Sequence, residues 1–76
     1  MKIKIRDMTG KEFSIEVNPG DTIDEVKEKI FRSQGIPVAA QKIILNSNLL
    51  EGGRTLADYD VEDGGTLMML IRPYFG

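Results

Sequence analysis

The side chains that most often perform catalysis are missing from this chain or lack their usual partners. The sequence has no cysteine and no histidine, which excludes a thiolate nucleophile, an imidazole base and the usual zinc ligands. Its serines, Ser14, Ser33 and Ser47, therefore have no histidine to activate them. We expect no enzymatic activity and no cofactor.

Acidic residues and glycines form two patterns that could bind ions, but neither has the required spacing. Asp58, Asp60, Glu62 and Asp63 lie close together without the regular spacing of a calcium-binding EF-hand loop. The two Gly-Gly pairs lie outside any phosphate-loop motif. We expect these carboxylates to be solvated loop charges, and we predict no metal site.

Length and composition indicate one small domain. With 76 residues, of which 41% are hydrophobic and 29% charged, the chain has the make-up of a soluble globular fold with a single core. A net charge of -2 with intermixed signs makes nucleic acid and anionic membranes poor candidate partners. We see no signal peptide and no transmembrane run, so we expect the protein in the cytoplasm, the nucleus or both. We also expect it to be a monomer.

Alternating residues predict two strands at the beginning of the chain. Residues 1–6 alternate apolar and basic, and residues 13–17 alternate apolar and polar, so each strand has one buried and one solvent-exposed face. Residues 7–10 form a turn in which Gly10 can adopt a positive φ angle. The two strands form a hairpin with Met8 at its tip.

A helix is predicted to begin after residue 22. Thr22 and Glu25 have the spacing of a capping box, and Gly35 is a typical stop. Spacings of three and four give the helix a narrow apolar stripe formed by Ile23, Val26 and Ile30. Lys27 and Lys29 lie beside this stripe, and we expect both ammonium groups in solvent.

The second half of the chain predicts short elements bounded by turn residues. Residues 41–45 form an apolar strand that ends at the turn residues 46–48, and residues 49–50 suit a brief fourth strand. Residues 55–59 resemble one helical turn that inserts a leucine into the core. A final strand covers residues 66–72, where five large apolar residues occur in a row.

One helix can cover only one face of such a sheet, so the other face meets solvent or another protein. Alternation assigns to the helix side Ile43, Leu45, Leu67, Met69 and Ile71. Ile44, Met68 and Leu70 must then lie exposed on the outer face. The rim of this surface is predicted to hold Met8, Lys42 and Arg72. An apolar patch with a basic edge is typical of a protein-binding site. The alternative is that self-association or a register shift buries it.

Matches to one family run through the whole chain without a gap. They occur at Met1, Ile3, residues 9–11, 16–17, Pro19, residues 21–23, 26–27, 29–30, 35–37, Gln41, Ile44, and residues 50–51, 53–56, 58–59 and 66–67. Through these residues the chain resembles the ubiquitin family. The resemblance implies an α+β, β-grasp fold, in which a mixed sheet of four or five strands packs on one main helix. Its first and last strands would be adjacent and parallel. We expect this domain to cover residues 1–72, followed by a flexible tail at residues 73–76.

The resemblance implies a recognition role for the outer surface. Ubiquitin uses a leucine, an isoleucine, a histidine and a valine where this chain has Met8, Ile44, Met68 and Leu70. A methionine in place of the titratable histidine makes the patch more apolar, more adaptable and less sensitive to pH near neutrality. The implied partners are ubiquitin-binding domains or proteasomal receptors.

The positions used by the family for covalent attachment are only partly retained. Candidate conjugation lysines remain at Lys11, Lys27 and Lys29. Asn48 and Asp63 stand at the two positions best known for chain linkage, and an amide or a carboxylate cannot be acylated as an amine can.

The last four residues depart most from the family pattern. Conjugated members end in an arginine-rich segment that closes with two glycines, whereas this chain ends in Pro73-Tyr74-Phe75-Gly76. Phe75 adds a ring where a hydrogen is expected, and Pro73 fixes φ and removes a hydrogen-bond donor. We therefore predict a non-conjugated ubiquitin-like interaction domain, of a kind that often forms the N-terminal part of larger proteins. The alternatives are a covalent modifier activated through Gly76, and a domain that uses the patch to pack within a larger chain.

Overall fold

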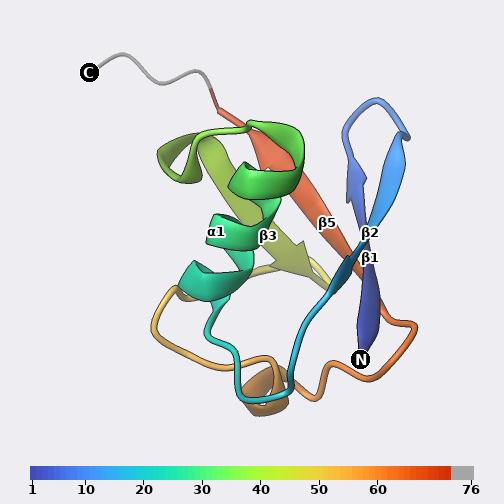
Figure 1. Cartoon of the computed structure of the whole chain (residues 1–76), viewed down its shortest axis with the longest axis vertical. Coiled ribbons are helices and arrows are strands. Elements are labelled where there is room, and N and C mark those ends of the chain that lie inside the picture. The colour runs from blue at the N-terminus through green and yellow to red at the C-terminus, as the bar shows by residue number, and fades with distance from the viewer. Residues whose placement is uncertain (73–76) are drawn as a thin grey trace.

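Five strands form one mixed sheet, and a single long helix lies across one of its faces (Figure 1). The computed structural model describes residues 1–72, so the predicted tail at residues 73–76 lies outside the described residues. The elements are, in chain order, β1 (Lys2–Asp7), β2 (Glu12–Glu16), α1 (Ile23–Gln34), the 3-10 helix η1 (Val38–Ala40), β3 (Gln41–Leu45), β4 (Asn48–Leu49), the 3-10 helix η2 (Ala57–Tyr59) and β5 (Thr66–Ile71).

The strand order is β2-β1-β5-β3-β4, which places the first and last strands side by side at the centre of the sheet. These two strands are parallel, and the other neighbouring pairs are antiparallel. The α+β, β-grasp fold predicted from the sequence is therefore confirmed. Strand order follows from the family resemblance, because alternation alone does not say which strands are neighbours.

The β1–β2 hairpin has the predicted alternation. Ile3 and Ile5 are buried between exposed basic residues, and Gly10 adopts the expected positive φ of 87° in the turn. The Asp7 carboxylate closes this turn by accepting hydrogen bonds from the backbone N–H groups of Thr9 and Lys11. The hydrogen bond from the Thr9 hydroxyl is the main cause that lowers the pKa of Asp7.

Helix α1 begins and ends where the sequence predicts. The Thr22 hydroxyl accepts the N–H of Glu25, and the Glu25 carboxylate accepts the N–H of Thr22, so the capping box is complete. Gly35 ends the helix in the left-handed conformation with φ 75°, and its N–H donates to the Phe31 carbonyl. Among residues 1–72, no helix is long and apolar enough to span a membrane.

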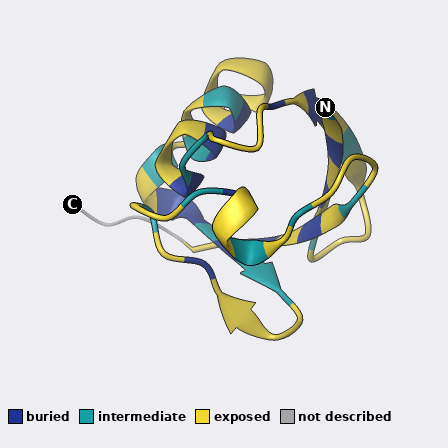
Figure 2. Cartoon of the chain, turned by 90° about the horizontal axis from the view of Figure 1, so that it is seen from below, coloured by how far each residue is buried: buried dark blue, intermediate teal, exposed yellow. Residues whose placement is uncertain are grey.

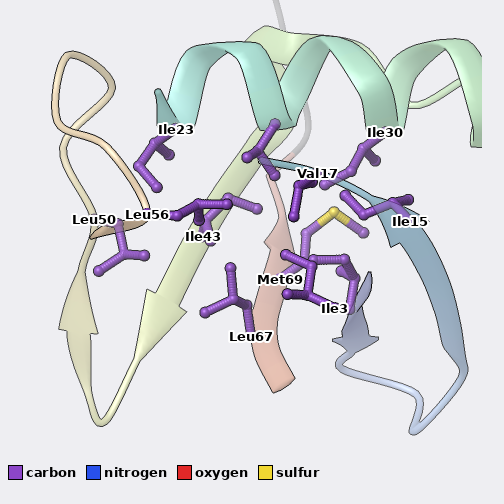
Figure 3. Close-up of a cluster of buried hydrophobic side chains, with 12 residues drawn as sticks. Ile3, Ile15, Val17, Ile23, Ile30, Ile43, Leu50, Leu56, Leu67 and Met69 are labelled. Carbon is purple, nitrogen blue, oxygen red and sulfur yellow. The ribbon is translucent and has the colours of Figure 1, made fainter. Parts of the chain in front are cut away.

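The core lies between α1 and the facing side of the sheet (Figure 3). The predicted stripe Ile23, Val26 and Ile30 is fully buried there. It packs against side chains from the strands and loops, namely Ile3, Ile5, Ile15, Val17, Ile43, Leu50, Leu56, Leu67 and Met69. Leu56 is 0% exposed, so the short helical turn does insert a leucine into the core, as expected. The outward sides of α1 and β4 are exposed (Figure 2).

The fourth strand differs from its prediction by one residue. The turn contains only Asn46 and Ser47, which both have positive φ angles of 51° and 69°, so β4 begins at Asn48. This two-residue turn with both central residues left-handed is the type I′ geometry that matches strand twist. As a result Leu49 pairs with Ile44 in the sheet, and Leu50 enters the core.

Ile71 lies on the predicted helix side of the sheet, because it pairs with the buried Gln41, but it does not join the core. Its side chain is 45% exposed, because it is the last residue of β5 and lies at the end of the sheet. There it lines a shallow surface pocket with Asp7, Met8 and Thr9.

Replacing Ser47 by Gly should stabilise the protein. Serine is strained at φ 69°, and glycine removes that strain, although it also adds freedom to the unfolded chain. We expect the free energy of unfolding to rise by about 0.5 kcal/mol, measured by urea unfolding. The matched control Asn46→Gly should change it less, because asparagine tolerates the left-handed region. A larger gain at position 46 than at position 47 would contradict this explanation.

Candidate protein-interaction surface

Strand register places four side chains in one row across the face that α1 does not cover. Met68 lies opposite Arg6 on one side and Ile44 on the other, and Ile44 lies opposite Leu49. Directly opposite residues project from the same face of a sheet. Leu70 is the next outward residue of β5, and it pairs with Lys42. We define the outer-face patch as Ile44, Leu49, Met68 and Leu70.

The members of the outer-face patch differ in how far they reach into solvent. Leu49 is 59% exposed and Met68 is 38% exposed. Ile44 and Leu70 face outward but are half-buried. The structure thus brings together the three predicted patch residues on strands and adds Leu49 to them.

The predicted rim residues occupy different places. Lys42 lies beside Leu70 and is half-buried. Arg72 is exposed just beyond β5, where its backbone N–H donates to the Ala40 carbonyl at 2.7 Å. Met8 is 67% exposed at the hairpin tip and shares the pocket of Ile71, so it lies at the end of the sheet rather than in the row.

The outer face of the sheet is cationic, although the chain carries a net charge of -2. Four basic side chains on the strands share this face, namely Lys2, Lys4, Arg6 and Lys42. Two acidic side chains share it, Glu12 and Glu16. Both acids are engaged, Glu12 with Arg6 and Glu16 with the N-terminal amino group at 3.8 Å. The apolar patch therefore lies in positive surroundings, which favour an acidic partner.

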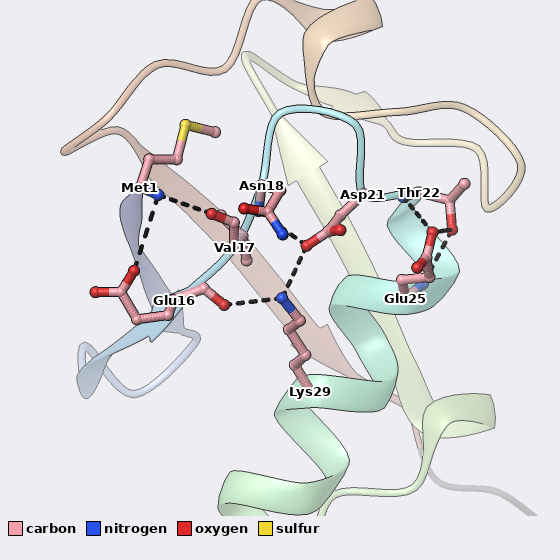
Figure 4. A network of polar contacts seen from close by, with 8 residues as sticks. All are labelled: Met1, Glu16, Val17, Asn18, Asp21, Thr22, Glu25 and Lys29. Atoms are coloured by element: carbon pink, nitrogen blue, oxygen red, sulfur yellow. Dashed lines mark hydrogen bonds and ion pairs between the residues drawn. The ribbon is translucent and has the colours of Figure 1, made fainter.

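The three candidate conjugation lysines have different environments. Lys11 is exposed, and Lys27 is half-buried. The Lys29 ammonium group donates to the Asp21 carboxylate at 2.8 Å and to the Glu16 carbonyl at 3.0 Å (Figure 4). The Lys29 ammonium group is therefore paired with a carboxylate and a carbonyl, while its side chain remains 34% exposed. The hydrogen bond from Lys29 is the main cause that lowers the pKa of Asp21.

Leu49 is the residue that sequence reasoning missed. The interpretation of residues 46–48 as a turn started the strand one residue late and gave Leu49 no defined face. The missed signal is the Asn-Ser pair after an apolar run, since two turn residues are enough to reverse a hairpin.

The mixed sheet, the single helix and the uncovered apolar face define a β-grasp domain of a class that generally interacts with other proteins. The chain belongs to the ubiquitin family, whose family model matches residues 2–74.

Its relatives include proteins of similar length. The chain is 31% identical to the ubiquitin-like protein NEDD8 of Dictyostelium discoideum, across 93% of this chain and 92% of the relative. It is 34% identical to the NEDD8-like protein RUB3 of Arabidopsis thaliana, across 93% and 91% of the two chains. It is also 37% identical to one part, 10% of the length, of the AN1-type zinc finger protein 4 of Mus musculus. That match covers 93% of this chain.

Replacing Asp21 by Asn should lower stability in a pH-dependent way. At pH 7 we expect the free energy of unfolding to fall by about 1 kcal/mol, because Lys29 loses an anionic partner that is partly open to solvent. The pKa of Asp21 lies below its ordinary value of 3.8 in the folded protein. Its stabilisation is therefore present above that value and is lost as the pH falls through the lower folded-state pKa.

Urea unfolding of wild type and variant at pH 7 and pH 2 would measure this effect. The difference between them should be smaller at pH 2. Asp60→Asn is the matched control, because Asp60 is exposed and its φ of 55° suits asparagine. An equal loss for Asp21→Asn at both pH values would show that the charge of Asp21 is not the cause.

Proposed function

We propose that this protein is a non-conjugated ubiquitin-like interaction domain that presents the outer-face patch to ubiquitin-binding motifs or proteasomal receptors. The observation that carries the proposal is the apolar row Met68, Ile44 and Leu49 on the sheet face that α1 leaves uncovered. Covering exposed apolar side chains with a partner is favourable, because it removes them from water. A patch of four residues suits reversible contact. The location proposed for this activity is the cytoplasm, the nucleus or both.

The cationic surroundings of the patch indicate which partners fit. Lys42 lies opposite Leu70 in the sheet, and Arg72 comes two residues after Leu70, just beyond the end of β5. A short amphipathic helix whose apolar side is flanked by Asp or Glu would match both the apolar row and the positive edge.

The residue types near Gly76 support the non-conjugated form of the proposal. Pro73 and Phe75 are poorly suited to an extended segment that passes through a narrow enzyme channel. The ion pair of Lys29 with Asp21 also occupies one of the three candidate acceptor amines.

Two alternatives have specific support. The match along nine-tenths of two NEDD8-type relatives supports a modifier activated through Gly76. The match to one part of a longer zinc finger protein supports a domain that packs against, or works beside, other parts of a larger chain.

Truncating Ile44 tests the binding proposal. Ile44→Ala should weaken binding of a ubiquitin-interacting helix by about tenfold or more, because it removes the centre of the patch. We expect a small stability loss of about 1 kcal/mol, because Ile44 is only half-buried. Binding is measured by calorimetry and by NMR titration. Phe31→Ala is the matched control, since Phe31 is 47% exposed on α1, away from this face.

The result that would contradict the proposal is an NMR map of perturbed residues that misses β3 and β5. Conjugation is tested separately by incubating the protein with ATP and candidate activating enzymes. A thioester at Gly76 on a non-reducing gel would replace the non-conjugated form with the modifier alternative.

A further inference from the structure

Leu49 is a leucine held in an exposed position by an ordered hairpin. Its side chain is 59% exposed, and its backbone is placed by the turn before it and the hydrogen bond after it. The Asn46–Ser47 turn sets the register in which Leu49 lies opposite Ile44. The following N–H, from Leu50, donates to the Ile43 carbonyl at 2.9 Å, and the Leu50 side chain is buried. Binding of a partner to Leu49 therefore costs little backbone entropy in the β3–β4 hairpin.

We propose that Leu49 determines which helix the outer-face patch accepts. The preferred partner is an acidic amphipathic helix that lies across β5, β3 and β4 and packs a third apolar residue on Leu49. This inference rests on the proposed function and deepens it. A helix with only two apolar residues would occupy Met68 and Ile44 and leave Leu49 in water.

The direction of the helix follows from the dimensions of the sheet. Neighbouring strands lie about 4.8 Å apart, so the backbone positions of Met68 and Leu49 are separated by about 10 Å across β3. On a helix, the rise of about 1.5 Å per residue puts positions i, i+4 and i+7 within about 10 Å along one side. The row from Met68 to Leu49 therefore has about the same length as the set of positions i, i+4 and i+7 on the partner helix. Along β5, Met68 and Leu70 span only about 7 Å, and a helix lying along that strand would miss Leu49.

The charges select an acidic helix over a second copy of this chain. On the outer face, Lys2, Lys4 and Lys42 have no ion-pair partner within residues 1–72, and both acidic side chains of that face are engaged. Two such faces brought together would place like charges opposite each other, which opposes self-association. A helix with carboxylates beside its apolar stripe would meet Lys42 next to Leu70.

Two synthetic helical peptides and one variant test this inference. Both peptides are rich in glutamate; one has leucine at positions i, i+4 and i+7, and the other has glutamine at i+7. We expect Leu49→Gln to weaken binding of the three-leucine peptide by about tenfold and of the two-leucine peptide by less than about twofold. Leu49→Met retains an apolar contact and should restore most of the affinity. Thermal unfolding and NMR spectra of each variant verify that the fold is intact.

The orientation is read from a spin label attached to each peptide end in turn. A label at one end should broaden the amide signals of the β3–β4 hairpin, and a label at the opposite end should broaden those near Arg6. Broadening that instead follows the two ends of β5 would overturn the crossing geometry.

The outcomes separate this inference from the proposed function. If Ile44→Ala abolishes binding while Leu49→Gln affects both peptides equally or neither, the role of Leu49 is refuted and the proposed function stands. If neither peptide binds, or if Ile44→Ala has no effect, the proposed function itself fails. Concentration-dependent shifts at Leu49 without peptide would place a second copy there and overturn the choice of partner.

Discussion

A single helix of twelve residues must cover a sheet of five strands, and it can cover only one face. This limit decides the role of each residue in the central strand β5. Both edges of β5 are hydrogen-bonded to neighbours, so its side chains can point only towards α1 or away from it. Leu67 and Met69 point towards α1 and are fully buried, while on the opposite face Met68 is exposed and Leu70 is half-buried. The surplus of apolar residues in β5 is the origin of the outer-face patch.

The placement of α1 over the sheet depends on polar contacts as well as on the core. The Asp21 carboxylate accepts the Asn18 N–H at 2.9 Å and the Lys29 ammonium, so it joins the loop before the helix to the middle of the helix. The Asp21 carbonyl also accepts the Leu56 N–H at 3.0 Å. One residue thus connects three segments that are distant in sequence. Contacts that hold Leu56 and α1 therefore share this one residue.

The sequence predicts local structure well because its signals are local. Alternation predicts β1 and β2, and the capping box with Gly35 predicts both ends of α1. Alternation also assigns Ile44, Met68 and Leu70 to the outer face. It does not show how far each reaches into solvent, because that depends on the strands that lie beside it. The exposure of Leu49 and Ile71 could not be predicted for the same reason, since a hairpin register sets one and the end of the sheet sets the other.

The contact between the Lys29 ammonium and the Glu16 carbonyl also bears on solubility. Strand β2 is an edge strand, and Glu16 is its last residue. A free carbonyl on an edge can accept an N–H from a strand of another molecule and so begin intermolecular sheet growth. Lys29 fills that acceptor at 3.0 Å and places a positive charge beside it, while Asp21 keeps the lysine in position. The same ion pair that anchors the helix therefore protects this end of the edge strand against aggregation.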